Sequence, residues 1–394
     1  MESCTHMGRT PEAEIRGRIA SNGPITFAEF MEVALYHPNG GYYTQDRQDP
    51  AHRDYYTSPS AHPAFSALIA IHLETMWKAL RRPTPFHVVE MGAGSGLMAQ
   101  DIIGYARQHL SPFAQSMRYF TVDKASDETP RGAVGCVLSN ELIDAFPVHR
   151  FEIENGTLVE LFVDVDAGGR FRSVVGEPST PLLAQRLDGL GLELPDGTRG
   201  EINLRISEWA RRVSEIIERG FVVTIDYGHK SKELYSPERS RGTLQTYYKH
   251  TSGSSPYQWI GRQDITAHVD FTTVIDEGLD VGLKPLSLMT QAEYLNRLGL
   301  KVWADRLRDR DISPRDVRAN ATAMRDLVDP EGLGGFKVLI QEKGAGLADV
   351  DWLFPSRQIV EQLPMPLLRS DHVPLFEGGY SSEMWEFEDS PMDE

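Results

Sequence analysis

A turn made of alternating glycines is the first place in this sequence where residue types and spacing could do chemistry. A short apolar run ends in the acid Glu90, and Gly92, Gly94 and Gly96 follow at alternate positions before an apolar stretch over residues 97–110. This order is typical of a buried parallel strand, a tight turn and the start of a helix. Glycine is needed in such a turn because a side chain would block the close approach of a ligand to the backbone.

The spacing of these glycines favours one kind of ligand. The pattern G-x-G-x-G differs from the dinucleotide fingerprint G-x-G-x-x-G. It suits a ligand that carries a bulky cationic group in place of a phosphate, such as S-adenosylmethionine (SAM). A plain glycine turn without a ligand is the alternative, because motifs this short also occur by chance.

Acidic and amide side chains follow the next two predicted strands. Asp123 ends the second strand, at the position where nucleotide-binding folds hydrogen-bond ribose hydroxyls. Asn140, Glu141 and Asp144 come just past the third apolar run, and therefore at the carboxyl edge of a parallel sheet, where such sheets bind their ligands. Two acids and an amide can hold a cationic amine or guanidinium. The alternative for Asp144 is a helix cap or a salt bridge.

Charge and length limit the class of protein. The 394 residues are enough for one large domain with insertions or for two domains. Acidic residues outnumber basic ones by 57 to 40, so the net charge is −17. This charge disfavours nucleic acid and anionic membranes as partners and attracts cationic substrates, although it also serves solubility alone.

The cysteines and the N-terminus point to a reducing compartment. Cys4 and Cys136 cannot form a disulfide framework. No uncharged apolar run reaches the roughly 18 residues that a membrane span requires. Glu2, Glu12 and Glu14 make the N-terminus unlike a signal peptide or an acid-poor transit peptide. We therefore expect a cytoplasmic protein without a membrane span, or a mitochondrial matrix protein if the source is eukaryotic.

Other catalytic chemistries lack their motifs. The twelve histidines form neither H-E-x-x-H nor a Cys/His knuckle, and His250 and His268 are too loosely spaced to indicate a metal site. The chain also has no G-x-S-x-G nucleophile elbow and no G-x-x-x-x-G-K-[ST] phosphate loop. We therefore expect no metal.

Periodicity predicts alternating helices and strands around this turn. Helices are expected over residues 11–37 with a break at 22–24, and over 65–80, 97–110 and 201–219, with further helical stretches after 271 to about 330. Strands are expected over residues 118–123, 134–139, 149–175 (with two hairpin turns), 220–228, 242–248 and 336–340. The stretches 54–60 and 251–263 are expected to be loops, and the chain beyond 344 to be extended or disordered.

Several blocks in this order resemble the MidA-like family of SAM-dependent methyltransferases, whose mitochondrial members are complex I assembly factors. The resemblance covers about residues 12–343, and the blocks S-N-E-L-I-D-A-F-P-V-H and D-I-T-A-H-V-D-F are specific to the family. The blocks are residues 23–31, 36–43, 57–59, 89–96, 139–149, 225–228, 242–244, 264–271 and 335–339.

The resemblance implies an α/β fold of the class I SAM-methyltransferase (Rossmann-like) type, with a mostly parallel sheet plus helical and β-hairpin insertions. It implies SAM as cofactor and methylation of arginine in a protein, with a respiratory complex subunit as one candidate substrate. Site residues carry over by position. SAM would be contacted by Glu90, Gly92, Gly94, Gly96 and Asn140, and its ribose by Asp123. The residues that would close over the cofactor are Thr57, Ser58 and Pro59. The methyl acceptor would be faced by Asn140, Glu141 and Asp144.

Two departures from the family pattern keep alternatives open. Ala93 and Ser95 stand where proline and a bulkier residue are common, and only about ten residues separate Asp123 from the next strand. The sheet is therefore expected to be truncated at its third-strand edge. A non-catalytic assembly or binding factor, or a methyltransferase for a small cationic natural product, remains an alternative, and a homodimer is compatible with the sequence.

This reading divides the chain into seven parts. We expect an N-terminal helical cap with a cofactor-covering loop (1–80), a SAM-binding core in two segments (81–148 and 201–250) and a β-hairpin insertion (149–200). A helical accessory region (251–332), a last core strand (333–344) and a Pro-rich, acidic tail (345–394) follow.

Overall fold

The computed structural model describes residues 10–45, 56–122, 129–248, 251–253, 255–347 and 349–372. Asp123, His250 and the last 22 residues of the chain lie outside these ranges. The chain folds into two compact units, here called the sheet unit (residues 56–142, 211–227 and 278–394) and the hairpin unit (residues 1–55, 143–210 and 228–277). Both contain helices and strands, so the expected mixed α/β content is confirmed.

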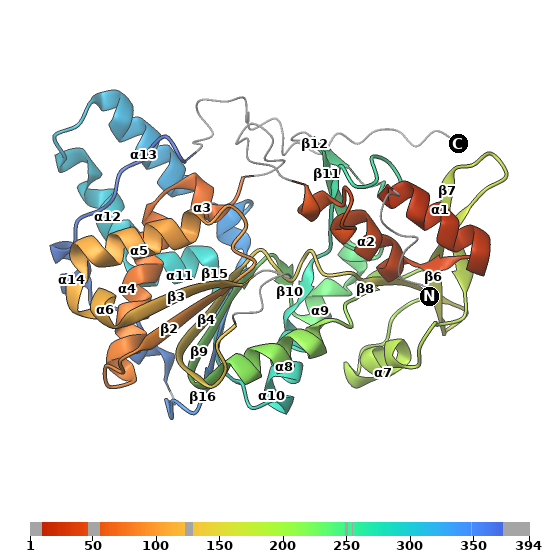
Figure 1. The fold of residues 1–394 in the computed structure, drawn as a ribbon, viewed down its shortest axis with the longest axis horizontal. Coiled ribbons are helices and arrows are strands. Elements are labelled where there is room, and N and C mark those ends of the chain that lie inside the picture. Colours follow the sequence, from red (N-terminus) through yellow and green to blue (C-terminus); the bar gives the residue numbers. More distant parts are fainter. Residues whose placement is uncertain are drawn as a thin grey trace. The chain divides into compact units, whose positions relative to one another are not determined.

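The sheet unit is built on a six-stranded sheet with the strand order β15-β16-β9-β4-β2-β3, whose strands run side by side in Figure 1. Its strands are β2 (Phe86–Met91), β3 (Met117–Val122), β4 (Ala133–Asn140), β9 (Ile217–Asp226), β15 (Lys284–Thr290) and β16 (Lys337–Lys343). The pairs β2–β3, β2–β4 and β4–β9 are parallel, whereas β16 runs antiparallel to β9 and to β15. Among the described strands, β3 pairs with β2 alone and is therefore an edge of this sheet.

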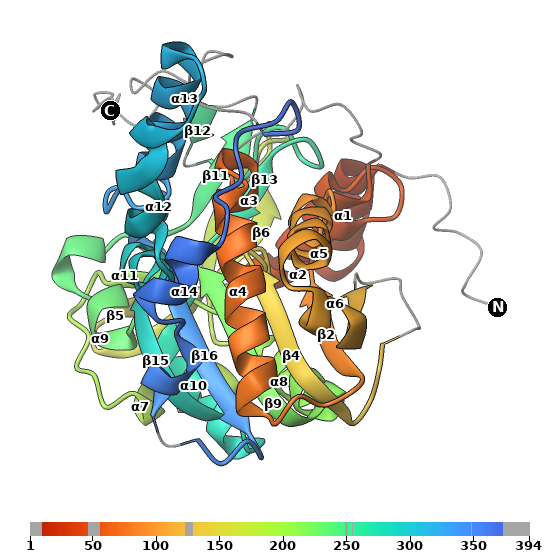
Figure 2. The ribbon, with the colours of Figure 1, turned by 90° about the vertical axis from the view of Figure 1, so that its left-hand side faces the viewer.

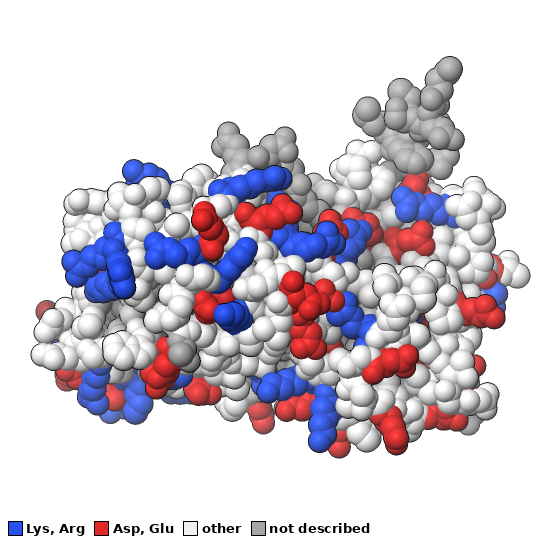
Figure 3. All heavy atoms as spheres, turned by 90° about the horizontal axis from the view of Figure 1, so that it is seen from below, with Lys and Arg blue, Asp and Glu red and all other residues white. Residues whose placement is uncertain are grey.

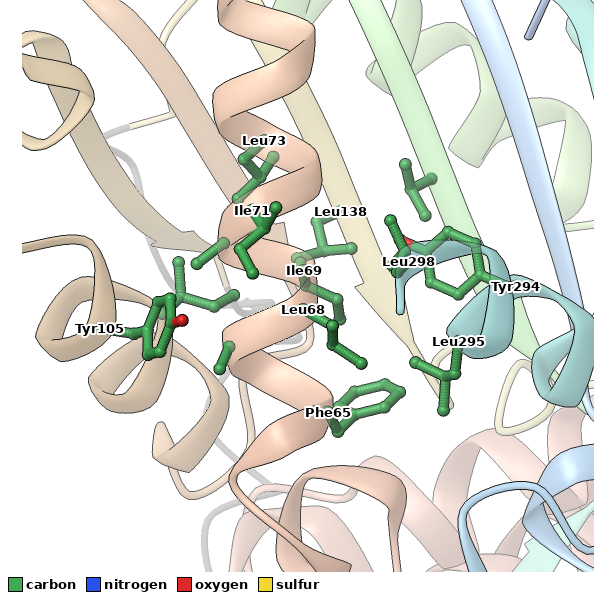
Figure 4. Close-up of a cluster of buried hydrophobic side chains, with 14 of the residues drawn as sticks. Phe65, Leu68, Ile69, Ile71, Leu73, Tyr105, Leu138, Tyr294, Leu295 and Leu298 are labelled. Carbon is green, nitrogen blue, oxygen red and sulfur yellow. The ribbon is translucent and has the colours of Figure 1, made fainter. Parts of the chain in front are cut away.

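Helices of the sheet unit surround one apolar core. They are α3 (Ser58–Ala61), α4 (Ala64–Ala79), α5 (Leu97–His109), α6 (Ser111–Ser116), α11 (Gln291–Leu298), α12 (Leu300–Arg306), α13 (Pro314–Asp326) and α14 (Arg357–Gln362), with 3-10 turns η4 (Leu307–Asp309), η5 (Leu333–Gly335) and η6 (Val350–Leu353). Helix α4 is apolar on nearly every side because it lies between the sheet and its neighbours α5 and α11 (Figure 2). Figure 4 shows its residues Phe65, Leu68 and Ile69 among Leu138 of β4 and Leu295 of α11.

The hairpin unit contains three smaller sheets. Its strands are β1 (Ile25–Thr26), β5 (His149–Glu154), β6 (Thr157–Val165), β7 (Phe171–Gly176), β8 (Arg199–Ile202), β10 (Gly228–His229), β11 (Gln245–Tyr248), β12 (Thr251–Gly253), β13 (Asp264–Thr266) and β14 (Val269–Asp270). Its helices are α1 (Pro11–Asn22), α2 (Phe27–Tyr36), α7 (Leu182–Gly189) and α9 (Ser231–Leu234), with 3-10 turns η1 (Tyr42–Thr44) and η3 (Pro237–Arg239). Two further helices, α8 (Ile206–Ile216) and α10 (Phe271–Asp280), contain residues of both units.

Several expected elements differ from those observed. Residues 284–290 form the edge strand β15 within a stretch expected to be helical, and residues 251–253 form β12 within an expected loop. Helix α8 starts at Ile206 rather than at residue 201, because residues 199–202 pair with β5 as β8. The prediction of an extended chain beyond 344 is wrong for residues 350–353 and 357–362, which form η6 and α14, and Val360 of α14 is only 1% exposed.

Surface charge on the face drawn in Figure 3 is mixed. Lysine and arginine side chains lie among aspartate and glutamate side chains there. The net charge of −17 therefore does not produce one continuous acidic field on this face.

Candidate functional site

The glycine turn between β2 and α5 provides open space beside the backbone. Gly92, Gly94 and Gly96 all lie in the left-handed region, with φ of +73°, +54° and +74°. Backbone bonds close the turn, since the Gly96 amide donates to the carbonyl oxygen of Ala93 at 2.9 Å. A Cβ at Gly94 or Gly96 would meet no described heavy atom within 4 Å. The turn therefore leaves room for a ligand against the backbone, as glycine in this conformation allows.

Gly92 is required for a different reason. A Cβ built on it would lie 2.7 Å from Cδ1 of Leu142. Leu142 follows β4, so its side chain packs against the glycine turn that follows the neighbouring strand β2. The turn after β4 and the turn after β2 are thus in contact through this pair.

Glu90 is buried beside a tyrosine that the sequence analysis missed. Glu90 is 2% exposed, and its Oε2 accepts a hydrogen bond from the hydroxyl of Tyr119 on β3 at 2.8 Å. Burial, and then the Glu90 carboxylate, hold the pKa of Tyr119 well above its usual value. The phenol is therefore a hydrogen-bond donor that fixes the acid at the end of β2.

Asn140 and Glu141 lie in a strained turn after β4. Glu141 has a φ of +51°, which is uncommon for a residue with a side chain and recurs at functional sites. Its amide donates to the carbonyl oxygen of Ile225 at 2.9 Å, and Nδ2 of Asn140 donates to its Oε1 at 2.8 Å. Oδ1 of Asn140 is buried and has no hydrogen-bond partner among the described residues. Since a buried acceptor without a partner is costly, this oxygen suits an N–H donor of a ligand.

The residues present fit a SAM-sized nucleoside with a cationic centre. The open turn at Gly94 and Gly96 admits the ligand's backbone-facing part, and the buried amide oxygen of Asn140 can accept from an ammonium or amide N–H. Asp123, expected at the ribose, lies outside the described residues.

The stretch expected to cover the cofactor begins a helix. Thr57 and Ser60 form a capping box at the start of α3, so residues 58–60 are helical and not loop as expected. Ser58 is fully buried, and its hydroxyl donates to Oε1 of Gln291 at 3.0 Å. Helix α3 contacts α5, the helix that the glycine turn starts. The role of Thr57, Ser58 and Pro59 in closing over the cofactor stays a prediction.

Asp144 belongs to the hairpin unit, because the division between the two units falls between Leu142 and Ile143. It is 5% exposed, and its backbone carbonyl accepts from the amide of Ala267 at 3.0 Å. Asp144 lies in a turn and not at the start of a helix.

Two tyrosines and a second aspartate accompany Asp144 within the hairpin unit. Tyr36, at the end of α2, stacks on Tyr43 of η1 with ring centroids 5.4 Å apart. The Tyr43 hydroxyl donates to Oδ2 of Asp264 at 2.7 Å, and the Tyr36 hydroxyl donates to the carbonyl oxygen of Ala145 at 2.9 Å. We call Tyr36, Tyr43, Asp144 and Asp264 the tyrosine–carboxylate group.

The two carboxylates of this group affect the pKa values of its two phenols. Burial raises the pKa of both phenols well above the usual value, and Asp264 and then Asp144 add to the shift in each. Both phenols therefore stay protonated at neutral pH. Asp264, fully buried at the start of β13, was not expected as a site residue, because Tyr43 lies 221 positions away in the chain.

The local sequence explains why α2 presents Tyr36 at its end. Thr26 and Glu29 form a capping box that fixes the start of the helix: the Glu29 amide donates to Oγ1 of Thr26 at 3.1 Å and the Thr26 amide to the Glu29 carboxylate at 2.9 Å. The helix ends at Tyr36, before His37-Pro38.

Metal ligation and membrane insertion receive no support from the described residues. There, no group of three or more His, Cys, Asp or Glu side chains is arranged to hold a metal ion. The rings of His268 and His229 are tilted against each other with centroids 5.4 Å apart. Burial, followed by His229, lowers the pKa of His268 to about 4. No helix in the described part of the chain is long and apolar enough to cross a membrane.

Comparison with known families defines the class of this protein. A family model described as "Putative S-adenosyl-L-methionine-dependent methyltransferase" matches residues 68–129 and 123–289, which is more than half of the chain. The chain therefore belongs to this family of SAM-dependent methyltransferases. The expected resemblance to MidA-like enzymes is confirmed.

Curated relatives carry one name. The "Protein arginine methyltransferase NDUFAF7, mitochondrial" of Xenopus laevis is 33% identical over 72% of this chain and 73% of its own length. The human protein of that name is 26% identical over 80% of this chain and 79% of its own, and the Drosophila melanogaster homologue is 28% identical over 66% and 68%.

A solved structure resembles this fold over most of its length. It is a COG1565 superfamily protein from Burkholderia thailandensis bound to S-adenosyl-homocysteine, with a TM-score of 0.74 and 27% identity, covering 87% of this chain and 94% of its own. Together with the family model, this supports SAM as the cofactor of the present chain, which is an enzyme of the methyltransferase class.

Proposed function

We propose that this methyltransferase transfers a methyl group from SAM to the guanidinium of an arginine in a protein. The names of its curated relatives support an arginine acceptor. The observation that carries the proposal is the tyrosine–carboxylate group, where two buried carboxylates stand beside two stacked phenols. Carboxylates bind a planar guanidinium through paired hydrogen bonds, and aromatic faces attract cations.

The chemistry asks the protein to orient the acceptor and to remove one proton. The cofactor supplies a sulfonium methyl, which is transferred by in-line displacement, so that orientation supplies most of the acceleration. Asn140, Glu141 and Asp144 would orient one guanidinium nitrogen and localise the positive charge away from it. A nearby carboxylate then accepts the proton that the nitrogen loses as the new N–C bond forms and the S–C bond breaks.

On the cofactor side we propose the positions expected from the sequence. The methionine part of SAM would be held by Glu90, Gly92, Gly94 and Gly96, and Asn140 would also contact the cofactor. Asp123 would lie at the ribose, and Thr57, Ser58 and Pro59 would lie over the bound cofactor. The open space at Gly94 and Gly96 supports the first of these assignments.

The sheet order supports a class I, Rossmann-like methyltransferase core that is truncated at the third-strand edge, since no described strand lies beyond β3. The parallel strands β9, β4, β2 and β3 and the antiparallel β16 are consistent with that core. We propose in addition the division of the chain into the seven parts expected from the sequence, except that residues 350–353 and 357–362 of the tail form η6 and α14.

The setting of the reaction follows from the same relatives. Their names place them in mitochondria, which supports the matrix rather than the cytoplasm as the working location. A protein substrate is part of the proposal, with a respiratory complex subunit as one candidate, and a homodimer is a further proposal.

Incubation with labelled SAM and a protein lysate tests this function. Wild-type protein is expected to label protein, and Asp144→Asn to reduce the labelling rate at least tenfold while S-adenosyl-homocysteine binds unchanged. Glu160→Gln is the matched control, since Glu160 is a fully buried acid of the hairpin unit that accepts from the Ser179 amide at 2.6 Å. Label found only in small molecules would favour a natural-product acceptor, and no label with intact cofactor binding would favour a non-catalytic binding factor.

A further inference from the structure

A buried aspartate at the end of β9 connects the two turns of the cofactor site. Asp226 has no exposed surface. Its Oδ2 accepts from the amide of Leu142 at 3.2 Å, and its Oδ1 accepts from the amide of Tyr227 at 2.9 Å. A carboxylate that accepts backbone N–H bonds in a buried place makes stronger bonds than a neutral acceptor does.

The Leu142 amide belongs to the strained turn after β4. Glu141 stands there at a φ of +51° and donates its own amide to Ile225, the residue before Asp226. Two consecutive amides of this turn therefore donate to two consecutive residues at the end of β9. Strain of this kind persists only where the surrounding structure holds it, and these two hydrogen bonds contribute to holding it.

The side chain of Leu142 passes this constraint on to the glycine turn. Its Cδ1 lies 2.7 Å from the ideal position of a Cβ at residue 92, which is too close for any residue but glycine. The carboxylate of Asp226, the turn at residues 140–142 and the glycine turn are thus a continuous chain of contacts inside the sheet unit.

We propose that Asp226 is a positioning residue for cofactor binding. Through the Leu142 amide it holds the Leu142 side chain against Gly92, and it thereby sets the spacing between the glycine turn and Asn140. Asp226 acts without touching the cofactor. The inference rests on the proposal that the glycine turn and Asn140 hold SAM.

Calorimetric titration with S-adenosyl-homocysteine tests this role without any methyl acceptor. An asparagine has one acceptor oxygen in place of two, so Asp226→Asn must lose one of the two backbone bonds. Its expected effect is about tenfold weaker binding, the size of one charge-assisted hydrogen bond. Leu142→Ala removes the contact with the glycine turn and is expected to weaken binding by a similar factor.

The double variant separates positioning from a general loss of structure. If Asp226 acts through Leu142, Asp226→Asn in the Leu142→Ala background weakens binding by less than a further threefold. If the double variant binds S-adenosyl-homocysteine about one-hundredfold more weakly than the wild type, the two substitutions act independently, and the inference is overturned. Unchanged affinity of Leu142→Ala for S-adenosyl-homocysteine also overturns the inference. This second test remains valid if Asp226→Asn does not fold.

Glu342 provides a matched control at the far end of the sheet. It is 4% exposed on β16, pairs in register with Phe221 of β9, and accepts from the amides of Ala345 and Gly346 at 2.8 and 3.2 Å. Glu342→Gln is expected to lower the melting temperature while leaving the affinity within twofold. An equal loss of affinity in Glu342→Gln refutes positioning by Asp226. Absence of binding by the wild type itself refutes the proposed cofactor site, whereas normal binding by Asp226→Asn refutes this inference alone.

Discussion

Replacing Gly94 by alanine has two separable effects on the glycine turn: it strains the backbone, and it fills space in which a ligand could bind. The residue has a φ of +54°, so any side chain there is strained, and the added Cβ would stand in the space left open beside the turn. The strain costs about 1–2 kcal/mol of folding free energy. If the ligand occupies the same space, the added methyl group is expected to weaken binding by about 2 kcal/mol, because overpacking a well-filled core costs a similar free energy.

A second glycine supplies the matched control. Gly282 of the sheet unit has a φ of +85°, and a Cβ there would also meet no described atom within 4 Å. Gly282→Ala therefore carries the same backbone strain as Gly94→Ala. Both variants are expected to melt a few degrees below the wild type.

The assay is calorimetric titration with S-adenosyl-homocysteine beside a thermal melt. Gly94→Ala is expected to bind about 30-fold more weakly, since 1.4 kcal/mol corresponds to a factor of ten. Gly282→Ala is expected to bind within twofold of the wild type. Binding by Gly94→Ala within threefold of the wild type, at a lowered melting temperature, would refute the assignment of this turn to the cofactor.

Four further variants test other features of the molecule. Tyr43→Phe removes the 2.7 Å bond to Asp264 and is expected to slow methyl transfer about tenfold with unchanged cofactor affinity; equal rates would remove the tyrosine–carboxylate group from the acceptor site. Leu353→Ala empties a fully buried position and is expected to cost about 2–5 kcal/mol in chemical denaturation, whereas Trp352→Ala, at a side chain 72% exposed, should change stability by about 0.5 kcal/mol or less. Burial lowers the pKa of His62 from 6.5 to about 4. The unfolded chain therefore binds a proton that the folded chain does not, and His62 makes stability fall by on the order of 3 kcal/mol as the pH drops from 6.5 to 4. Because burial also lowers the pKa of His268 to about 4, His62→Gln is expected to make the fall in melting temperature shallower without abolishing it, and an unchanged pH profile would contradict the assignment.

Elements that depend on local patterns could be predicted from the sequence. The strand, the glycine turn and helix α5 follow one another as expected, and α5 runs from Leu97 to His109. The break between α1 and α2 lies at Gly23-Pro24, where the sequence indicates it. Such elements are predictable because periodicity and glycine positions lie within a few residues of each other.

Elements that depend on partners distant in the chain could not be predicted from the sequence. Strand β15 is a strand because residues 284–290 pair with β16, about fifty positions later, and its own side chains are half exposed. The packing of residues 349–372 depends on single apolar side chains, such as Leu353 and Met365, that are too irregularly spaced to form a periodic pattern.

The residues of the candidate site show the same difference between local patterns and distant partners. The glycines and the turn after β4 were expected by position, whereas Asp264 and Tyr119 were not, because their partners are distant in the chain or on a neighbouring strand. Asp226 is an acid near the end of a strand expected from the sequence, but its hydrogen bond to the Leu142 amide depends on the parallel pairing of β4 and β9. A search for acids at the ends of adjacent parallel strands would have found it.

Mass spectrometry of proteins after incubation with isotopically methyl-labelled SAM tests the central claim most directly. The account predicts that labelled methyl groups appear on arginine guanidinium nitrogens, and that Gly94→Ala and Asp144→Asn both reduce them. Label on lysine, on carboxylates or only in small molecules, or labelling of arginine that Asp144→Asn leaves unchanged, would contradict it.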